Sequence, residues 1–215
     1  MSFANDVLLL TLEPALFRDV AWVSQRLVLG AGSCSGTVLT MTSQDVLFDA
    51  GGVDTGNVVL VAGTGYEVIA RVSGTVLTIS RLRASDDDAL TPVSGASDVE
   101  VSVPTFAPQI AMVHRQVLRM IGIEPDVPEE AGSIGPSAIV NPGALARVEA
   151  LGALHLIYAA AGSALGPESA PARKAEFYRQ RFADERQRAV AMIDTDADGQ
   201  PDAVRRLNIL ALVRG

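Results

Sequence analysis

The sequence has little of several residue types, and each shortage excludes a class of protein. A single cysteine, Cys34, leaves no internal disulfide and no cysteine-based zinc site. Aromatic residues make up only 5% of the 215 residues, so the core must be built mainly from Ala, Val, Leu and Ile. Basic residues number 17 against 25 acidic ones, and the net charge of −8 argues against a protein that binds nucleic acid by neutralising phosphates.

Targeting signals and membrane spans are not evident in the sequence either. The N-terminus has no basic start, and Asp6 precedes its short apolar run at residues 7–10, so no signal peptide is predicted. The apolar stretch 150–166 is shorter than the ~20 residues that span a bilayer, and it contains His155. We therefore expect a buried helix at this stretch and no association with a membrane.

The residues that are present give the first half of the chain the pattern of a β domain. Apolar residues reach 48% of the chain, enough for a folded core. Short β-branched runs between Gly and Ser turn signals predict strands at 36–41, 57–62, 66–72, 75–82 and 99–103. This spacing is typical of a small barrel or sandwich, which we expect over about 20–104.

Two local patterns add detail to this β half. Gly63-Thr64-Gly65 lies between two predicted strands and indicates a hairpin with a tight or bulged turn. The heptapeptides SGTVLTM (35–41) and SGTVLTI (73–79) nearly repeat. Convergence on one turn-and-strand solution is favoured, because no longer repeat accompanies the pair, and a duplicated hairpin stays open as the alternative.

The second half, from about 105 to 193, has helical periodicity. A first helix is capped by Thr105 and ends at Gly122, with apolar positions at Phe106, Ile110, Val113, Val117 and Ile121. Asn141 is expected to cap an apolar helix over about 143–162, with Pro142 in its first turn. Pro171 opens a third helix over about 172–193, with a predicted buried stripe at Ala175, Tyr178, Phe182, Ala189 and Ile193.

The linker 123–142 is rich in proline and has no apolar period, which is unusual for so long a connection inside a compact domain. We expect it to pack against something outside its own fold, such as a neighbouring subunit. The predicted fold class is therefore α+β, with a β-rich domain over 1–104 that includes a short N-terminal segment. A helical bundle over 105–193 follows, and then an Asp-rich turn with an extended C-terminal tail over 194–215.

Charge follows the same division of the chain. Residues 1–104 carry 5 basic and 12 acidic groups, net −7, whereas residues 105–215 carry 12 basic and 13 acidic groups, net −1. A solvated acidic surface accounts for this asymmetry most simply. The functional interpretation is an acidic surface that repels a polyanion passing close by and so does not bind it.

No candidate enzyme site is convincing. Gly32-Ser33-Cys34-Ser35-Gly36 has the outline of a nucleophile elbow, but that motif needs a helix after it, and residues 37–42 read as a strand. We expect Cys34 to be a small, partly buried residue in a turn. His114 and His155 lie on predicted helices with no carboxylate or second histidine at i+3 or i+4, so we expect packed or surface roles for both.

The sharpest local motif is DTDADGQPD, residues 194–202. Asp194, Asp196 and Asp198 followed by Gly199 match the first positions of a calcium loop, and Asp202 matches a later one. The bidentate Glu of the full motif is replaced by Arg205. A helix is expected to enter the loop. The sequence thus predicts a truncated Ca²⁺ site on these four aspartates. The alternative is an Asx-rich turn in which the following arginines balance the charge. No other cofactor is expected.

The order of features in the second half resembles a known family. The Ala-rich helix ALGALHLIYAAAG is followed by KAEFYRQRFADERQRAV, then by the Asp/Gly turn, and finally by RRLNILALVRG. This order is similar to that of head–tail connector proteins (adaptor or head-completion proteins) of tailed double-stranded-DNA bacteriophages. The first half also resembles a phage virion module, in LEPALFRDVAWVSQRLVLG and the turn-and-strand unit after it. Simple adaptors are little more than a helix bundle, so the β half is a departure from the family pattern.

The resemblance implies a structural protein and not an enzyme. Such a protein forms a ring of identical copies, twelve in number, docked on the portal in the virion neck after assembly in the host cytoplasm. The ring extends the channel through which DNA passes without sequence-specific binding, and it presents a platform to a head-closure or tail protein. The family's C-terminal segment reaches into the portal, a role carried here to residues 203–215, in particular Arg205, Arg206, Leu207, Ile209, Leu210, Leu212, Val213 and Arg214.

Two alternatives remain open at this stage. Within the same neck, the chain could be a head-closure or tail-terminator ring one level lower. From a different class, it could be a calcium-stabilised β-rich binding module, against which the lack of a signal peptide counts.

Overall fold

The computed structural model describes residues 2–125 and 134–207. It divides the chain into two compact units. The first, the barrel unit, is Asn5–Phe106. The second, the helical unit, joins Met1–Ala4 to Ala107–Gly215. The barrel unit is therefore an insertion in the sequence of the helical unit, entered after Ala4 and left after Phe106.

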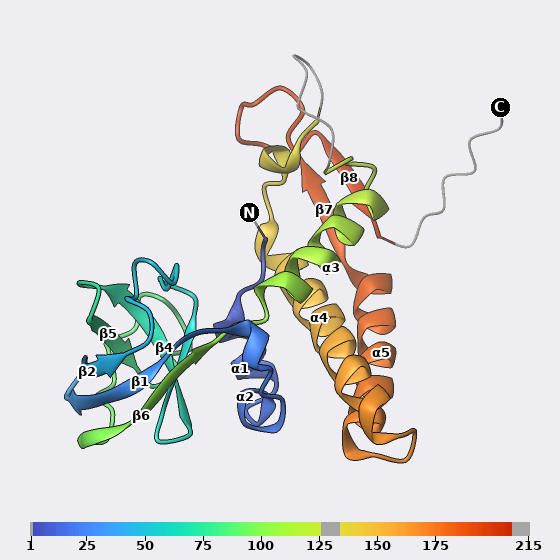
Figure 1. Ribbon diagram of the computed structural model, residues 1–215. Coiled ribbons are helices and arrows are strands. Elements are labelled where there is room, and N and C mark those ends of the chain that lie inside the picture. The colour runs from blue at the N-terminus through green and yellow to red at the C-terminus, as the bar shows by residue number, and fades with distance from the viewer. Residues whose placement is uncertain (1, 126–133, 208–215) are drawn as a thin grey trace. The chain divides into compact units, whose positions relative to one another are not determined.

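The barrel unit is built on a closed barrel with the strand order β1-β2-β5-β4-β3-β6 (Figure 1). All pairings between neighbouring strands are antiparallel. The strands are β1 (Arg26–Ser35), β2 (Val38–Gln44), β3 (Val58–Val61), β4 (Thr64–Arg71), β5 (Val76–Ser80) and β6 (Ala96–Pro104). The prediction of a small β domain of short strands is confirmed. Because the sheet closes on itself, the domain is a barrel and not a sandwich.

Strand β1 was not predicted, because glycines interrupt its pattern. A Cβ on Gly30 would lie 2.0 Å from the Ser43 carbonyl oxygen, and one on Gly32 would lie 2.9 Å from the Thr40 carbonyl oxygen. The pairing of β1 with β2 also shifts register between Ala31 and Gly32. Gly30 and Gly32, which interrupt the strand pattern in the sequence, are thus the residues that let β1 approach β2 closely at a bulge.

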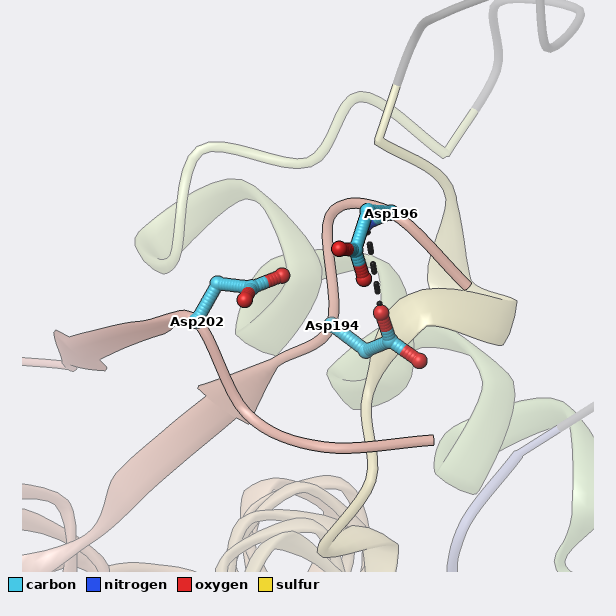
Figure 2. Close-up of side chains that lie close together, drawn as sticks. All are labelled: Asp194, Asp196 and Asp202. Atoms are coloured by element: carbon cyan, nitrogen blue, oxygen red, sulfur yellow. Dashed lines mark hydrogen bonds between the residues drawn. The ribbon is translucent and has the colours of Figure 1, made fainter. Parts of the chain in front are cut away.

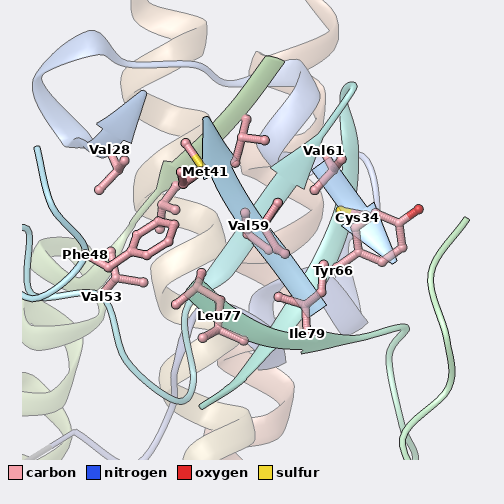
Figure 3. Packing of buried hydrophobic residues seen from close by; sticks show 14 of the residues in the cluster. Val28, Cys34, Met41, Phe48, Val53, Val59, Val61, Tyr66, Leu77 and Ile79 are labelled. Atoms are coloured by element: carbon pink, nitrogen blue, oxygen red, sulfur yellow. The ribbon is translucent and has the colours of Figure 1, made fainter. Parts of the chain in front are cut away.

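The barrel is filled by small aliphatic side chains, as the low aromatic content requires (Figure 3). Phe48 and Tyr66 are the aromatic members of the buried cluster, and the other members are mostly Val, Leu and Ile. The predicted hairpin between β3 and β4 is confirmed. Its two turn residues are Ala62 and Gly63, both with positive φ (48° and 77°), which is the backbone of a type I′ turn.

The two near-identical heptapeptides pair with each other. They form the starts of β2 and β5, which run antiparallel with Leu39 opposite Leu77. The flanking hydrogen bonds are equivalent: Met41 N–H donates to the Thr75 carbonyl at 2.9 Å, and Ile79 N–H donates to the Thr37 carbonyl at 2.8 Å. A local twofold axis therefore passes between Leu39 and Leu77 and relates the paired parts of β2 and β5. The equivalence ends at the turns, because Gly36 has a positive φ (61°) and its counterpart Gly74 does not.

This symmetry predicts matched losses of stability. Leu39 and Leu77 are both fully buried, so Leu39→Ala and Leu77→Ala should each lower the free energy of unfolding of the barrel unit by about 2–5 kcal/mol. The two losses should agree to within about 1 kcal/mol, the precision of such comparisons, in urea titrations followed by circular dichroism. Val38→Ala, at a position that is 42% exposed, is the control and should have a small effect. Clearly unequal losses would show that the two environments are not equivalent.

Two short helices, α1 (Asp6–Leu12) and α2 (Leu16–Asp19), and the turn η1 (Val23–Gln25) precede the barrel within the same unit. Asp6 joins the two ends of this unit. Its buried carboxylate accepts hydrogen bonds from the Thr105 hydroxyl at 2.7 Å, the Phe106 N–H at 2.8 Å and the Asn57 amide at 3.3 Å. Burial raises the pKa of Asp6, although these hydrogen bonds act in the opposite direction.

The helical unit contains α3 (Ala107–Met120), α4 (Pro142–Leu165) and α5 (Ala170–Arg188), with α4 packed against both others (Figure 1). A 3₁₀ turn, η2 (Pro136–Ala138), precedes α4. A hairpin of β7 (Val190–Ile193) and β8 (Ala203–Arg206) follows α5. The three predicted helices are present, and the buried positions of α3 include Ile110, Val113 and Val117, as expected.

Three predictions about the helical unit are wrong in detail. The third helix ends at Arg188 and not near 193, because residues 190–193 form β7. Ala189 and Ile193 fit a helical stripe, but both also fit the two-residue alternation of a strand, in which Ala191 and Ile193 point inward. Residues 203–206 form a strand and are not the start of an extended tail. The Asn141 side chain does not cap α4, since it bonds to the backbone of Val190 and Met192 in β7.

The described part of the predicted linker packs within its own unit. Ile123 and Ile139 are buried. Val140 N–H donates to the Met192 carbonyl at 3.0 Å, and Asp194 N–H donates to the Ala138 carbonyl at 2.8 Å. Residues 134–141 therefore lie along β7, so the expectation that the linker is packed from outside does not hold for them. Residues 126–133 lie outside the described residues.

Helix α4 is long and apolar enough to cross a membrane, and among the described residues it is the one helix of that kind. Over half of its apolar window (56%) is buried inside the helical unit, including the charged Glu149. This burial fits the predicted core helix.

Candidate functional site

The Asp-rich segment forms the turn that joins β7 to β8. Asp194 follows the last residue of β7, and Asp202 directly precedes β8, so a strand and not a helix enters the loop. Carboxylate oxygens of Asp194, Asp196 and Asp202 lie within 4.8 Å of one another (Figure 2). Asp198, the fourth predicted ligand, does not belong to this group.

Backbone N–H groups hold these carboxylates. Asp194 accepts hydrogen bonds from the N–H groups of Asp196 (3.2 Å), Ala197 (2.7 Å) and Gly199 (2.7 Å). Asp202 accepts from the N–H of Thr195 at 2.7 Å and from its hydroxyl at 2.8 Å. These donors stabilise the charged forms, so the hydrogen bond from Gly199 above all lowers the pKa of Asp194, and those from Thr195 lower the pKa of Asp202.

Arg205, which the turn interpretation expected to balance this charge, forms no ion pair with the aspartates within the residues that the structure describes. The guanidinium of Arg205 donates to the Ile121 carbonyl at 2.6 Å, at the end of α3. The turn is instead held by the amides just described and by positive φ at Ala197 (63°) and Gly199 (84°). Three ionised carboxylates with converging oxygens are what a hard cation such as Ca²⁺ prefers, so calcium binding stays a prediction for Asp194, Asp196 and Asp202.

Calcium binding can be tested with a control variant from the same turn, at Asp198. Isothermal titration of the full chain with Ca²⁺ near neutral pH should give binding heat, and Asp196→Asn should weaken binding because it removes one of the three charges. Asp198→Asn is the matched variant, since Asp198 lies outside the converging group. An absence of binding heat in the unmodified protein would leave only the hydrogen-bonded turn.

The predicted docking residues fall in two groups. Arg205 and Arg206 lie in β8, and Leu207, which is 3% exposed, is part of the core of the helical unit. Ile209, Leu210, Leu212, Val213 and Arg214 lie outside the described residues, so their role stays a prediction.

Sequence analysis missed a buried cluster around Glu149 in α4. Its Oε2 accepts hydrogen bonds from the N–H groups of Phe3 (2.9 Å) and Ala4 (3.0 Å), and its Oε1 lies 2.5 Å from Nδ1 of His114 in α3. The rings of Phe3 and His114 meet edge to face at 4.8 Å. His114 thus does have a carboxylate partner, one that lies 35 residues away in sequence. A lone Glu at the start of a very apolar helix was the available sign.

Cys34 is a buried residue of β1, 6% exposed, and burial raises the pKa of its thiol. The expectation that Cys34 lies in a turn is wrong, because it pairs with Leu39 as part of the strand and the turn follows Ser35. The next residues form strand β2, as predicted from residues 37–42, so the geometry of a nucleophile elbow is not present there.

Comparisons of the chain with models of protein families, with curated proteins and with solved structures find no match.

Proposed function

We propose that the chain is a structural protein of a tailed bacteriophage, one that forms a ring in the virion neck and connects the portal to the tail. The observation that carries this proposal is the insertion of the barrel unit, Asn5–Phe106, into the helical unit. With the insertion set aside, the rest is three helices and a β7–β8 hairpin whose turn is the Asp/Gly segment. From α4 onward, two helices, the Asp/Gly turn and a terminal strand follow the order of the adaptor proteins that the sequence resembles. The β half is then an added module on an adaptor-like base.

The charge distribution supports the same role. Residues 1–104, nearly all of them in the barrel unit, carry a net charge of −7. A DNA molecule passing such a surface meets repulsion rather than the neutralising contacts that would hold it. This suits a conduit, in which the polyanion must move without being bound.

The proposal is tested by inactivating the gene in the phage that encodes the protein. We expect DNA-filled or leaking heads without tails, beside free tails, in electron micrographs, and restoration by the gene supplied from a plasmid. After mild dissociation of normal virions, the protein should stay with the heads. Recovery with the free tails would favour the tail-terminator alternative, and normal virions without the protein would overturn the proposal.

A further inference from the structure

A cleft of about 1280 Å³ lies within the helical unit, between the second half of α3, the end of α5 and β8. Arginine is its most frequent lining residue, and none of the lining residues within 2–125 and 134–207 is acidic. This is a local concentration of positive charge in a protein whose net charge is −8. The five arginines are Arg115, Arg119, Arg186, Arg205 and Arg206.

Of these five, Arg119 is paired with Glu124 (3.0 Å), whereas Arg115 and Arg206 are the charges that the cleft offers to a partner. The Nε of Arg186 is buried and has no hydrogen-bond partner among the residues that the structure describes. Arg115 and Arg206 form no ion pair within residues 2–125 and 134–207, and both are exposed. Arg205 is fixed by the Ile121 carbonyl, so part of the charge is held in place. Because the guanidinium groups of Arg115 and Arg206 are exposed and have no ion-pair partner among the described residues, the cleft is suited to an anionic group that enters it.

The cleft also has an apolar component. Met112 is 55% exposed and Val204 is 64% exposed, and both line the cleft beside the buried Ile121 and Leu207. A free phosphate or a nucleic-acid backbone offers nothing to cover these side chains. A peptide segment that carries carboxylates beside apolar residues can satisfy both parts of the surface.

The barrel unit displays a preformed acidic loop, Ser85–Asp88. Arg83 shapes it from within, through a nearly buried ion pair with Glu67 (2.6 Å) and hydrogen bonds to the carbonyls of Asp86 (2.6 Å) and Asp88 (3.1 Å). The Ser85 N–H donates to Asp88 at 3.0 Å, and the Asp86 side chain is fully exposed although its carboxylate also lies 3.7 Å from the Arg83 guanidinium. The backbone is thus fixed while carboxylates project outward, so little conformational entropy would be lost on binding. The exposed Leu90 follows two residues later.

We propose that the arginine cleft of one copy receives the acidic loop of a second copy. The contact joins two different surfaces, so it is heterologous, and repetition of such a contact closes a ring when the rotation between copies allows it. The inference rests on the ring-forming role proposed above and names the contact that would build the ring. Complementary charge also offsets the general repulsion between copies that each carry −8.

The test is a charge exchange in the full-length protein. Self-association of the unmodified chain, measured by sedimentation and native mass spectrometry, should weaken with rising salt. Arg115→Glu with Arg206→Glu should weaken association at least tenfold, as should Asp86→Arg with Asp87→Arg. An equimolar mixture of the two double variants should associate again. The acidic cleft of the first variant can receive the basic loop of the second, and the unmodified cleft of the second can receive the unmodified loop of the first. Arg173→Glu with Arg181→Glu, at exposed positions of α5 outside the cleft, is the matched control and should leave association unchanged.

Three results would overturn the inference. One is a chain that stays monomeric, another is association that survives reversal of the cleft arginines, and the third is a mixture that fails to associate. Binding of a duplex oligonucleotide that depends on Arg115 and Arg206 but not on Asp86 and Asp87 would assign the cleft to nucleic acid instead. Failure of this inference is separable from failure of the neck role, because reversal variants that still join heads to tails would contradict only the contact proposed here.

Discussion

Removal of residues 208–215 is expected to leave a folded protein that no longer joins filled heads to tails. The segment contains Ile209, Leu210, Leu212 and Val213, and covering such side chains contributes roughly 1.5–3 kcal/mol each. The resemblance to adaptor proteins assigns this burial to the portal. The deletion begins after Leu207, so it keeps β8 and the buried side chain that follows it. Micrographs of phage carrying the truncated gene should show tailless heads beside free tails.

A longer truncation separates docking from folding. Removal of residues 203–215 also takes away β8, the buried Leu207 and the hydrogen bond from Arg205 to the Ile121 carbonyl. We expect this variant to lose stability in the helical unit, seen as a lower urea midpoint by circular dichroism, whereas the shorter truncation keeps the normal midpoint. If the shorter truncation is equally destabilised, residues 208–215 belong to the core. If it still joins heads to tails, the docking role is wrong.

Replacement of Glu149 by alanine is expected to lower the free energy of unfolding of the helical unit by about 3–5 kcal/mol, the usual result of removing one partner from a buried charged cluster. The change leaves the buried Ala4 N–H and the His114 ring without their acceptor, and it opens a hole beside α4. Urea titration, followed by a probe in the helical unit, measures the loss.

Two variants sharpen this result. Glu149→Gln keeps an oxygen that can accept from Phe3 and Ala4, so its loss should be clearly smaller than that of Glu149→Ala. Glu176→Ala removes an exposed carboxylate that is paired with Arg179, and it should change stability little. A Glu149→Ala protein as stable as the Glu176→Ala protein would show that the cluster does not hold the N-terminus.

The elements that sequence could predict are those whose own residues determine them. The pairing of β3 with β4 was readable because Gly63 permits the turn, and α3 was readable from its apolar spacing. Strand β1 could not be predicted, because Gly30 and Gly32 are needed for close packing against the backbone of β2, a contact that local sequence does not reveal. The boundary between α5 and β7 was missed because the positions of Ala189 and Ile193 fit both the spacing of a buried helical face and the alternation of a strand.

The candidate sites show the same limit. The aspartates of residues 194–202 are close in sequence, so their convergence was foreseeable, whereas the exclusion of Asp198 and the strand that enters the loop were not. The arginine cleft brings α3 together with α5 and β8, and residues 121–169 lie between α3 and α5 in the sequence. Glu149 and Ala4 lie 145 residues apart and meet only through the fold.

The hydrogen bonds from Thr105 and Phe106 to Asp6 link the stability of the helical unit to the folding of the barrel unit. The barrel unit interposes 102 residues between Ala4 and Ala107. If that stretch were unfolded, closing it would cost the helical unit about 4 kcal/mol in chain entropy. With Asp6 bonded to Thr105 and Phe106, the folded insert behaves as a short tether, and Phe3 and Ala4 are presented to Glu149 at high effective concentration. Melting the barrel should therefore loosen the N-terminal residues from α4 through the backbone alone.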